Sequence, residues 1–292
     1  MLNFIRFDVS KFFKSKAIWM CIFFLTIFLS IVTFVQVKDS GQSYSDYQLD
    51  YQSQEAEIKE EKDKDATIRV HRELAPLMSE EEFNDLQADL KNSMTISNVF
   101  FENYSILTIF AFIFFALFVG NDFSTGYLKN MLAIQGAKWK WVTSKMVVAI
   151  TFFVIMSLVI LGFGLVNEVL SQQFLADNPW KDHLILFLPQ VLLFMIIMQF
   201  AVALILLTQS KVTTIVIATL FGMGLHSQLL NFIGQSIGID LVSKLYSSQL
   251  LSMGQAYHDN YFEVLLIGLI YLSVLYIFNR WYIYKVDFKF DH

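Results

Sequence analysis

The chain has 292 residues and a mean hydropathy of +0.52, with 55% hydrophobic but only 16% charged residues. A soluble domain carries roughly a quarter charged residues, so this composition excludes an ordinary soluble domain and favours a multi-pass membrane protein. Three prolines, 12 glycines and one cysteine exclude collagen, whole-chain disorder and a disulfide scaffold. The net charge of −5 argues against nucleic acid as a partner.

The first segment, residues 1–16, combines apolar side chains at helical spacing with basic ones. A basic, aromatic amphipathic segment is typical of a helix that lies flat on the cytoplasmic membrane surface, with its cations reaching lipid headgroups. The alternative is a basic start to the first membrane span, and we favour the flat interfacial helix. The apolar residues are Leu2, Ile5, Val9, Phe12 and Phe13, and the basic ones are Arg6, Lys11, Lys14 and Lys16.

Six apolar runs follow, and each has the length of about 20 residues that one helical crossing of a bilayer needs. We therefore expect an all-α polytopic membrane protein with a single transmembrane domain over residues 1–292. The first run is longer than the apolar part of a signal peptide and no small-residue cleavage site follows it. The predicted transmembrane helices are 17–37, 99–120, 146–166, 184–210, 212–232 and 262–282.

Basic residues near the span ends predict the orientation of the chain. Twelve of them flank the ends on one side, whereas only Lys181 and Lys244 flank the other. Because cytoplasmic loops are enriched in Lys and Arg, both termini are expected in the cytoplasm of a cell whose plasma membrane the chain crosses.

The only sizeable polar block, residues 38–97, carries 15 acidic and seven basic residues. Pro76 separates two helix-forming stretches, and Ser79 with Glu82 has the spacing of a capping box. This pattern predicts an extracellular helical hairpin between the first two spans. It would serve either as a lid or receptor surface for an exported molecule or as a solvated spacer. The expected apolar face of the second helix consists of Phe83, Leu86 and Leu90.

Residues 233–261 mix glycine with apolar residues and few charges, which predicts an extracellular or re-entrant segment before the last span. Non-helical backbone at membrane depth persists only where protein buries it. Gly222 and Gly224 indicate that the fifth helix bends or ends early. His226 is either a functional intramembrane residue or a hydrogen-bonded residue near a helix end.

Motifs that carry chemistry are missing from the sequence. It contains no Walker A loop, no H-E-x-x-H, no G-x-S-x-G and no histidines at metal-ligand spacing. The sole acid within the apolar runs is Glu102, since Glu263 lies at the edge of the last predicted span, just before its apolar run. We therefore expect no catalytic, cofactor-binding or metal residues, and a transport pathway driven by another subunit rather than an enzyme.

One segment, residues 121–140 after the second span, is more informative. Asp122 or Ser124 could cap a short helix there. Such a helix would act as a stiff lever, since a force on it would move two spans together. Its apolar and aromatic face would consist of Phe123, Tyr127, Leu128, Met131 and Leu132.

This segment resembles the signature of type-2 ATP-binding-cassette (ABC) transporter permeases. In that family an acidic-aromatic-x-x-Gly stretch follows the second span, and a Gly-Lys or Ser-Lys pair opens the third. The six-span layout with both ends inside resembles the family over nearly the whole chain. The family often has Glu in place of Asp122 and a proline near Gln135-Gly136, neither of which this chain has. The matching residues are Asp122, Phe123, Gly126, Tyr127 and Leu128, with Ser144-Lys145 as the later pair.

The resemblance implies the permease subunit of an ABC exporter, paired as a homodimer or heterodimer and driven by a separate nucleotide-binding ATPase that holds the ATP and Mg. The cargo would be amphipathic or hydrophobic, such as an antimicrobial peptide, toxin, lipid-like compound or drug. The residues implied at the ATPase contact, or coupling helix, are Asp122, Phe123, Gly126, Tyr127, Leu128, Met131, Leu132 and Lys145. Those suggested for the substrate path are Thr26, Ser30, Thr33, Asn103, Ser105, Thr108, Thr213, Thr214, Thr219 and His226.

Two other functions compete with this one. A stand-alone membrane immunity or binding protein would capture an antimicrobial peptide with the 38–97 hairpin and would act without ATP. An integral membrane enzyme is disfavoured, because the sequence offers no converging catalytic groups.

Overall fold

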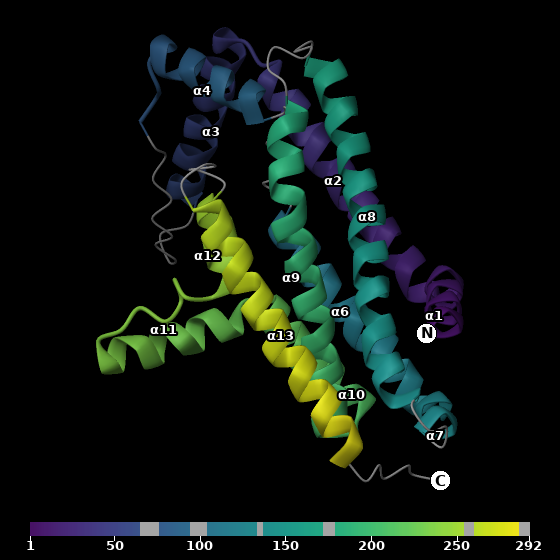
Figure 1. Cartoon of the computed structure of the whole chain (residues 1–292). Helices are drawn as coiled ribbons and strands as arrows, with labels where there is room; N and C mark the ends of the chain where they lie inside the picture. The colour runs from purple at the N-terminus through teal and green to yellow at the C-terminus, as the bar shows by residue number, and fades with distance from the viewer. Residues whose placement is uncertain (65–75, 94–103, 133–136, 172–178, 254–259, 286–292) are drawn as a thin grey trace.

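The computed structural model describes residues 1–64, 76–93, 104–132, 137–171, 179–253 and 260–285, and in these ranges every regular element is a helix (Figure 1). The helices are α1 Leu2–Lys14, α2 Lys16–Ser40, α3 Tyr44–Lys64, α4 Glu80–Ser93, α6 Tyr104–Ser124, α7 Tyr127–Leu132, α8 Ala137–Ser171, α9 Pro179–Thr208, α10 Lys211–Gly222, α11 Leu225–Ile237, α12 Tyr246–Met253 and α13 Tyr261–Lys285.

Five of the described helices, α2, α6, α8, α9 and α13, are long and apolar enough to cross a membrane. The pair α10 and α11 passes the same test as a unit, which brings the number to six if the pair is one span. Five or six helices of this length and apolarity indicate a multi-pass membrane protein, as the composition predicted.

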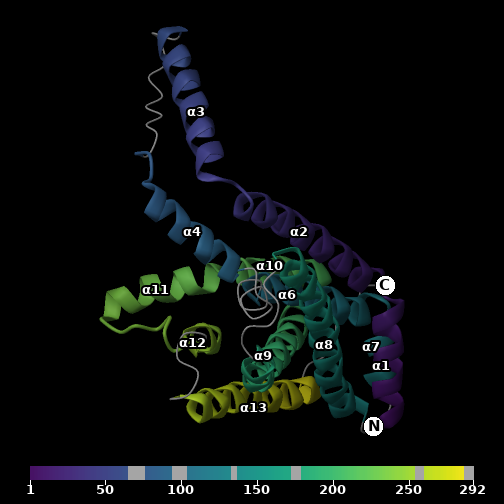
Figure 2. The same cartoon turned by 90° about the horizontal axis from the view of Figure 1, so that it is seen from above.

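The fifth span differs from its prediction. Instead of one helix over 212–232, α10 ends at Gly222 and α11 starts at Leu225, with a bend of 66° between them. The bend falls at the glycines that marked an interruption in the sequence. As a result α11 runs sideways out of the bundle, which both views show (Figures 1 and 2).

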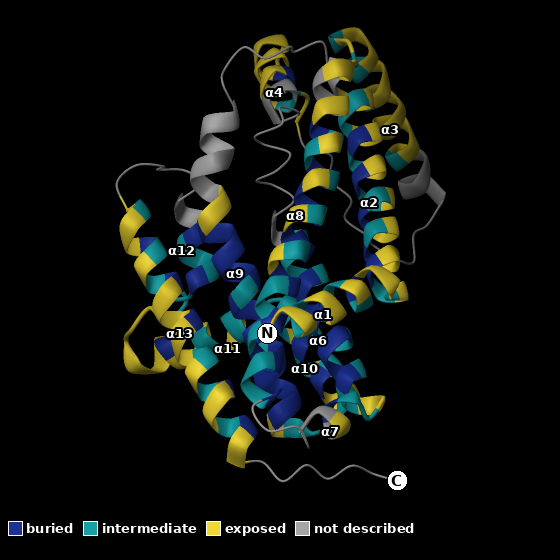
Figure 3. Cartoon of the chain, turned by 45° about the vertical axis from the view of Figure 1, so that its right-hand side comes forward, coloured by how far each residue is buried: buried dark blue, intermediate teal, exposed yellow. Residues whose placement is uncertain are grey.

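The bundle is built around α9, which packs against α6, α8, α10, α12 and α13. In the most apolar stretch of α9, 72% of the residues are buried, compared with 28% in α2 and 17% in α13. The outer helices α2 and α13 therefore carry broad exposed apolar faces (Figure 3). Such faces suit contact with lipid tails, which solvate apolar side chains as well as a protein interior does.

Aromatic rings fill the centre of the bundle where α6, α8 and α9 meet. Phe114 stacks on Phe152 with ring centroids 5.0 Å apart, and Phe115 meets Phe152 edge-on at the same distance. The ring centroids of Phe153 and Phe194 lie 5.1 Å apart. All of these side chains are buried, so the packing of flat rings fixes the spacing of the three helices.

A buried amide pair ties α13 to the centre. Asn279 Nδ2 donates to the backbone carbonyl of Gln199 over 2.7 Å and to Gln199 Oε1 over 2.9 Å. Gln199 Nε2 donates in turn to the carbonyl of Val142 on α8 over 3.2 Å. Polar side chains at apolar depth are stable when they bond across helices in this way.

The polar insertion forms two helices, α3 and α4, at the end of the bundle opposite α7 (Figure 1). The predicted capping box is confirmed: the Ser79 amide donates to Glu82 Oε2 over 2.8 Å, and the Glu82 amide donates to Ser79 Oγ over 3.3 Å. Phe83 packs beneath Tyr44 and Tyr47 of α3.

The predicted apolar face of α4 is only partly right. Phe83 is buried, but Leu86 is 43% exposed. Gln87 is buried in its place, because its Nε2 donates to the carbonyl of Asp39 at the end of α2 over 2.7 Å.

Candidate functional site: a buried charge cluster joining α1, α6 and α8

Four charged side chains meet where α1 crosses the ends of α6 and α8, and together they form what we call the charge cluster: Asp8, Lys11, Asp122 and Lys145. Lys145 Nζ lies 2.6 Å from Asp122 Oδ2 and 2.9 Å from both carboxylate oxygens of Asp8. Lys11 Nζ pairs with Asp122 Oδ1. The cluster holds two carboxylates and two ammonium groups, so its formal charges cancel.

Nearly all of the charge cluster is withdrawn from solvent. Asp122 and Lys145 are 0% exposed and Asp8 is 1% exposed, whereas the Lys11 side chain is 25% exposed. Taking an ion out of water costs several kcal/mol, and this cost is offset only when partners and hydrogen bonds surround the ion. Neutral groups must therefore complete the surroundings of these ions.

Neutral side chains supply further bonds to both carboxylates. Trp141 Nε1 donates to Asp122 Oδ2 over 2.8 Å, and the Ser144 hydroxyl donates to Asp8 Oδ2. The Phe118 ring lies 4.9 Å from the Nζ atoms of both Lys11 and Lys145, a cation–π distance. The ions are thus surrounded by oriented donors and an aromatic face rather than by water.

The charge cluster explains how α1 is held. The helix runs across the bundle rather than along it (Figures 1 and 2). Its Phe12 side chain is fully buried and meets Phe114 edge-on at 5.4 Å. Lys11 was expected to reach lipid headgroups, but it points inward because Asp122 offers a buried counter-charge.

Sequence reasoning missed Asp8, although a signal for it exists. Asp8 is the sole acid among the first 38 residues, in a segment that is otherwise basic and apolar. A carboxylate on the apolar side of an amphipathic helix needs a buried cation, and Lys145 is that cation.

Beyond the charge cluster, the chain turns sharply into α7. The second predicted span, 99–120, ends too early: α6 continues to Ser124, so Asp122 belongs to α6 and does not cap the next helix. Gly126 has φ +69°, a left-handed conformation that glycine adopts without strain, and α7 starts at the next residue. Residues 99–103 of the predicted span lie outside the described residues.

Tyr127, the first residue of α7, connects this helix to α1. Its ring stacks on Phe7 with centroids 4.8 Å apart and an interplanar angle of 15°. Burial, together with the nearby carboxylate of Asp8, raises the pKa of Tyr127 to about 12. The phenol is therefore neutral over the physiological range.

The residues implied at the ATPase contact differ in their burial, and two of their side chains are not described. Asp122, Leu128 and Lys145 are fully buried, so they are internal contacts of this chain rather than surface groups. Phe123, Gly126 and Tyr127 are half-buried. The backbone of Met131 and Leu132 belongs to α7, and their side chains lie outside the described residues. Among the described side chains of this region, the exposed ones are Ser124, Thr125 and Asn130.

The residues suggested for a substrate path do not gather on one surface. Thr108 and His226 line a cavity among α6, α9, α11, α12 and α13. Several other hydroxyls bond within their own helices or to the adjoining turn. Ser30 donates to the carbonyl of Thr26, Thr219 to that of Ile215, and the buried Thr214 to that of Ser210.

The remaining path residues take no part in this cavity. Thr33 is buried, and Thr213 bonds to Ser210 at the start of α10. Asn103 and the side chain of Ser105 lie outside the described residues. Among the described residues no three His, Cys, Asp or Glu side chains form a group that could hold a metal ion.

Comparison with known proteins adds no identification. A scan of protein families, a search of curated proteins and a search of solved structures each find nothing that matches this chain.

Proposed function

We propose that the chain is the membrane-spanning permease subunit of an ABC exporter, in which α7 and its flanking turn receive the movement of a separate ATPase. The observation that carries the proposal is the charge cluster. It joins α1, α6 and α8 through buried ion pairs directly beside the short helix that connects α6 to α8.

The mechanical argument starts from the cost of separating the charges. Removing one partner of a buried ion pair typically costs about 3–5 kcal/mol, because it leaves an uncompensated charge. A displacement of α7 would therefore carry α1, α6 and α8 along as one body rather than pull the ions apart. Stacking of Phe7 on Tyr127 adds a direct contact between α1 and α7.

The remaining parts fit the same assembly. In the orientation predicted by the basic residues, α1 lies flat at the cytoplasmic surface of a bacterial plasma membrane, and α3 with α4 forms an extracellular hairpin. The bent pair α10 and α11, with α12, then forms a re-entrant element before α13. A second permease, identical or different, would cover part of the exposed apolar faces, and an amphipathic cargo would cross between the two.

Docking of the ATPase is tested by affinity purification of the tagged full-length chain from its native membrane, followed by mass spectrometry. An ATPase with a Walker motif should accompany the chain. The variant Asn130→Arg places a large cation on the exposed surface of α7 and should reduce the recovered ATPase at least about fivefold. Asn84→Arg, an exposed change on α4 at the opposite end of the bundle, is the matched control and should recover the wild-type amount.

Either of two results would overturn the exporter function. The first is a purification that yields no ATPase in a mild amphiphile. The second is equal loss of ATPase in both variants, which would show that α7 is not the contact. A Gly126 variant is a poor probe, because its positive φ makes any other residue strain the turn itself.

A second candidate function is a stand-alone immunity or binding protein for an antimicrobial peptide. The observation in its favour is an aromatic contact between α3 and α4, in which Phe83 contacts Tyr44 and Tyr47. Excision of residues 44–93 would then abolish protection of the cell, whereas deletion of the ATPase would leave protection intact. The exporter function predicts loss of protection in the ATPase deletion.

A further inference from the structure

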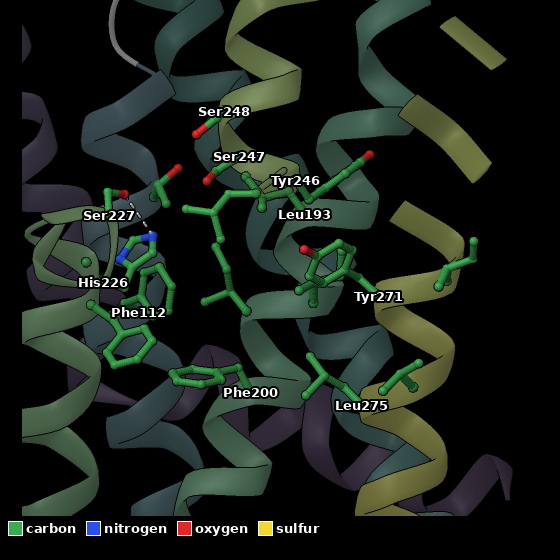
Figure 4. Close-up of a pocket in the computed structure, with 18 residues that line it drawn as sticks. Phe112, Leu193, Phe200, His226, Ser227, Tyr246, Ser247, Ser248, Tyr271 and Leu275 are labelled. Carbon is green, nitrogen blue, oxygen red and sulfur yellow. Dashed lines mark hydrogen bonds between the residues drawn. The ribbon is translucent and has the colours of Figure 1, made fainter. Parts of the chain in front are cut away.

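A cavity of about 650 Å³ lies among the helices beside α13, and Figure 4 shows the side chains that line it. Its walls come from α6, α9, α11, α12, α13 and the end of α10. Sites for small molecules are commonly about 300–1,000 Å³ in volume, so this cavity has the size of a binding site rather than of a packing defect.

One end of the cavity is apolar and aromatic. Phe112 of α6 lies 6.1 Å from Phe200 of α9, and Phe200 lies 4.7 Å from Phe221 of α10, measured between ring centroids. These three rings form a continuous apolar wall, two members of which Figure 4 labels beside the cavity. Such a wall gains free energy when hydrocarbon rather than water covers it.

Polar side chains lie beside and above the aromatic wall. The His226 ring stacks on Phe221 with centroids 5.3 Å apart, and its Nε2 lies 3.4 Å from Ser227 Oγ. The hydroxyls of Ser247 and Ser248 lie above them in Figure 4, at the end of the cavity away from Phe200. Ser247 and Ser248 both line the cavity, and each hydroxyl can donate one hydrogen bond and accept others.

The lack of charge in the described lining restricts which head groups the cavity can bind. Among the described residues that line the cavity there is no Asp, Glu, Lys or Arg. An ionised head group would therefore lose its hydration without gaining a counter-charge, which costs far more than the burial of a hydrogen-bonded hydroxyl. The polar end consequently suits an uncharged head that exchanges hydrogen bonds with serine hydroxyls.

The route into the cavity passes α13. Ile270 and Val274 line the cavity although they are 53% and 61% exposed. They belong to a helix whose outer face is broadly apolar, and α13 is one of the helices long enough to span the membrane. The entrance therefore faces the region that lipid tails occupy.

We propose that this cavity binds a single-chain membrane amphiphile with an uncharged, hydroxyl-bearing head, of the monoacylglycerol class. The acyl chain lies against Phe112, Phe200 and Phe221, and the head bonds to Ser247 and Ser248. The ligand enters from the lipid phase past Val274. This inference does not rest on the coupling of an ATPase to α7.

The test uses the full-length chain in phosphatidylcholine nanodiscs and a monoacylglycerol with a photoactivatable diazirine on its acyl chain. Cross-linked peptides are located by mass spectrometry. Labelling should concentrate on residues of the cavity wall, and unlabelled monoacylglycerol should compete with the probe. A fatty acid anion and an alkyltrimethylammonium cation of the same chain length should compete at least about tenfold more weakly.

Two sets of variants separate binding from general adhesion to the apolar surface. Val274→Trp narrows the entrance and should lower labelling at least about fivefold, while Ile277→Trp should leave it unchanged. Ile277 lies on the same helix, is 64% exposed and does not line the cavity, so it is a matched control. The double variant Ser247→Ala, Ser248→Ala removes two hydrogen bonds to the head and should weaken competition by about tenfold.

Three results would overturn the proposal. One is labelling spread over the outer faces of α2 and α13 without a maximum in the cavity. Another is equal competition by the charged and uncharged amphiphiles, which would remove the argument from charge. The last is equal labelling of the Val274→Trp and Ile277→Trp variants, provided that both elute as the wild type does in size-exclusion chromatography.

Discussion

Lys145 Nζ lies 2.9 Å from each carboxylate oxygen of Asp8, a residue 137 positions earlier in the chain. Both side chains are buried, and the contact joins the N-terminal helix α1 to the third long helix of the bundle, α8. The same ammonium group also binds Asp122 on α6. One cation therefore joins α1 to α6 and α8, which lie more than 80 residues further along the chain, and its removal has a predictable consequence for each partner.

We expect Lys145→Met to lower the free energy of unfolding by about 3–5 kcal/mol, because it leaves Asp8 buried with only the Ser144 hydroxyl as partner. Asp122 keeps its second cation, Lys11. The double variant Lys145→Met, Asp8→Asn removes both charges of the orphaned pair and should recover more than half of the loss. Equilibrium unfolding in mixed detergent micelles measures both values.

The double variant is also the control, since it contains the same loss of the lysine side chain. Equal destabilisation of the single and double variants would mean that packing of the lysine stem, rather than uncompensated charge, sets the cost. In that case the charge cluster would not be the clamp that the proposed coupling needs.

The pH dependence of Tyr127 gives a second prediction. Its phenol has a pKa of about 12 in the folded chain, against an ordinary value of 10, because burial and the carboxylate of Asp8 disfavour the phenolate. Between these two values the unfolded chain releases the proton before the folded chain does. The contribution of Tyr127 to the free energy of unfolding therefore falls as the pH rises from 10 to 12.

Titration of phenolate absorbance checks this value. Subtracting the curve of Tyr127→Phe from that of the wild type isolates one phenol, and the difference should have its midpoint near pH 12. A midpoint at the ordinary value of 10 would show that α1 does not cover Tyr127 in solution.

The sequence predicted the helical, membrane-spanning character of the chain because length and apolarity are local properties. The same holds for the Ser79–Glu82 capping box, which depends only on a spacing of three residues. Gly222 and Gly224 likewise marked the site where α10 and α11 are bent by 66°. The direction in which α11 leaves the bundle was not predictable, since glycine permits many backbone conformations at the bend and the sequence pattern does not select one of them.

The charge cluster shows where local patterns stop being informative. Asp122 and Lys145 were selected for their place in a family-like motif and were expected at a surface that contacts an ATPase. The structure buries both, because Asp8 and Lys11 of α1 complete their charges. No periodicity in the sequence indicates which residues of α1 face residues more than 100 positions away. Pairing of buried charges is a global property of the fold.

The amide pair between α9 and α13 gives a third prediction. Asn279→Leu leaves the side-chain and backbone oxygens of Gln199 without their donor, so we expect a loss of about 1–2 kcal/mol in the free energy of unfolding. A double-mutant cycle with Gln199→Leu should give a coupling energy between about 0.6 and 1.7 kcal/mol, the average and the maximum found for hydrogen bonds between membrane helices. A coupling energy of zero would mean that the two amides do not interact.

The last prediction concerns the close approach of α12 to α13. A Cβ atom added at Gly268 would lie 2.6 Å from Tyr246 Cζ and 2.8 Å from its hydroxyl oxygen. The Tyr246 ring is buried, and its hydroxyl donates to the carbonyl of Pro189 on α9 over 2.8 Å. Gly268→Val should therefore displace the ring and break this bond, lowering the free energy of unfolding by about 1–3 kcal/mol.

Gly162→Ala is the control, because no neighbouring atom lies within 4 Å of the position its Cβ would occupy on α8. Alanine is the better helix former, so this change should be neutral or stabilising by up to about 1 kcal/mol. Tyr246→Ala removes the ring that valine would meet. Gly268→Val should therefore lower the free energy of unfolding less in the Tyr246→Ala background than it does in the wild type. Purely additive effects of the two changes would show that valine at position 268 does not meet the Tyr246 ring, and hence that α12 does not pack on α13 at this point.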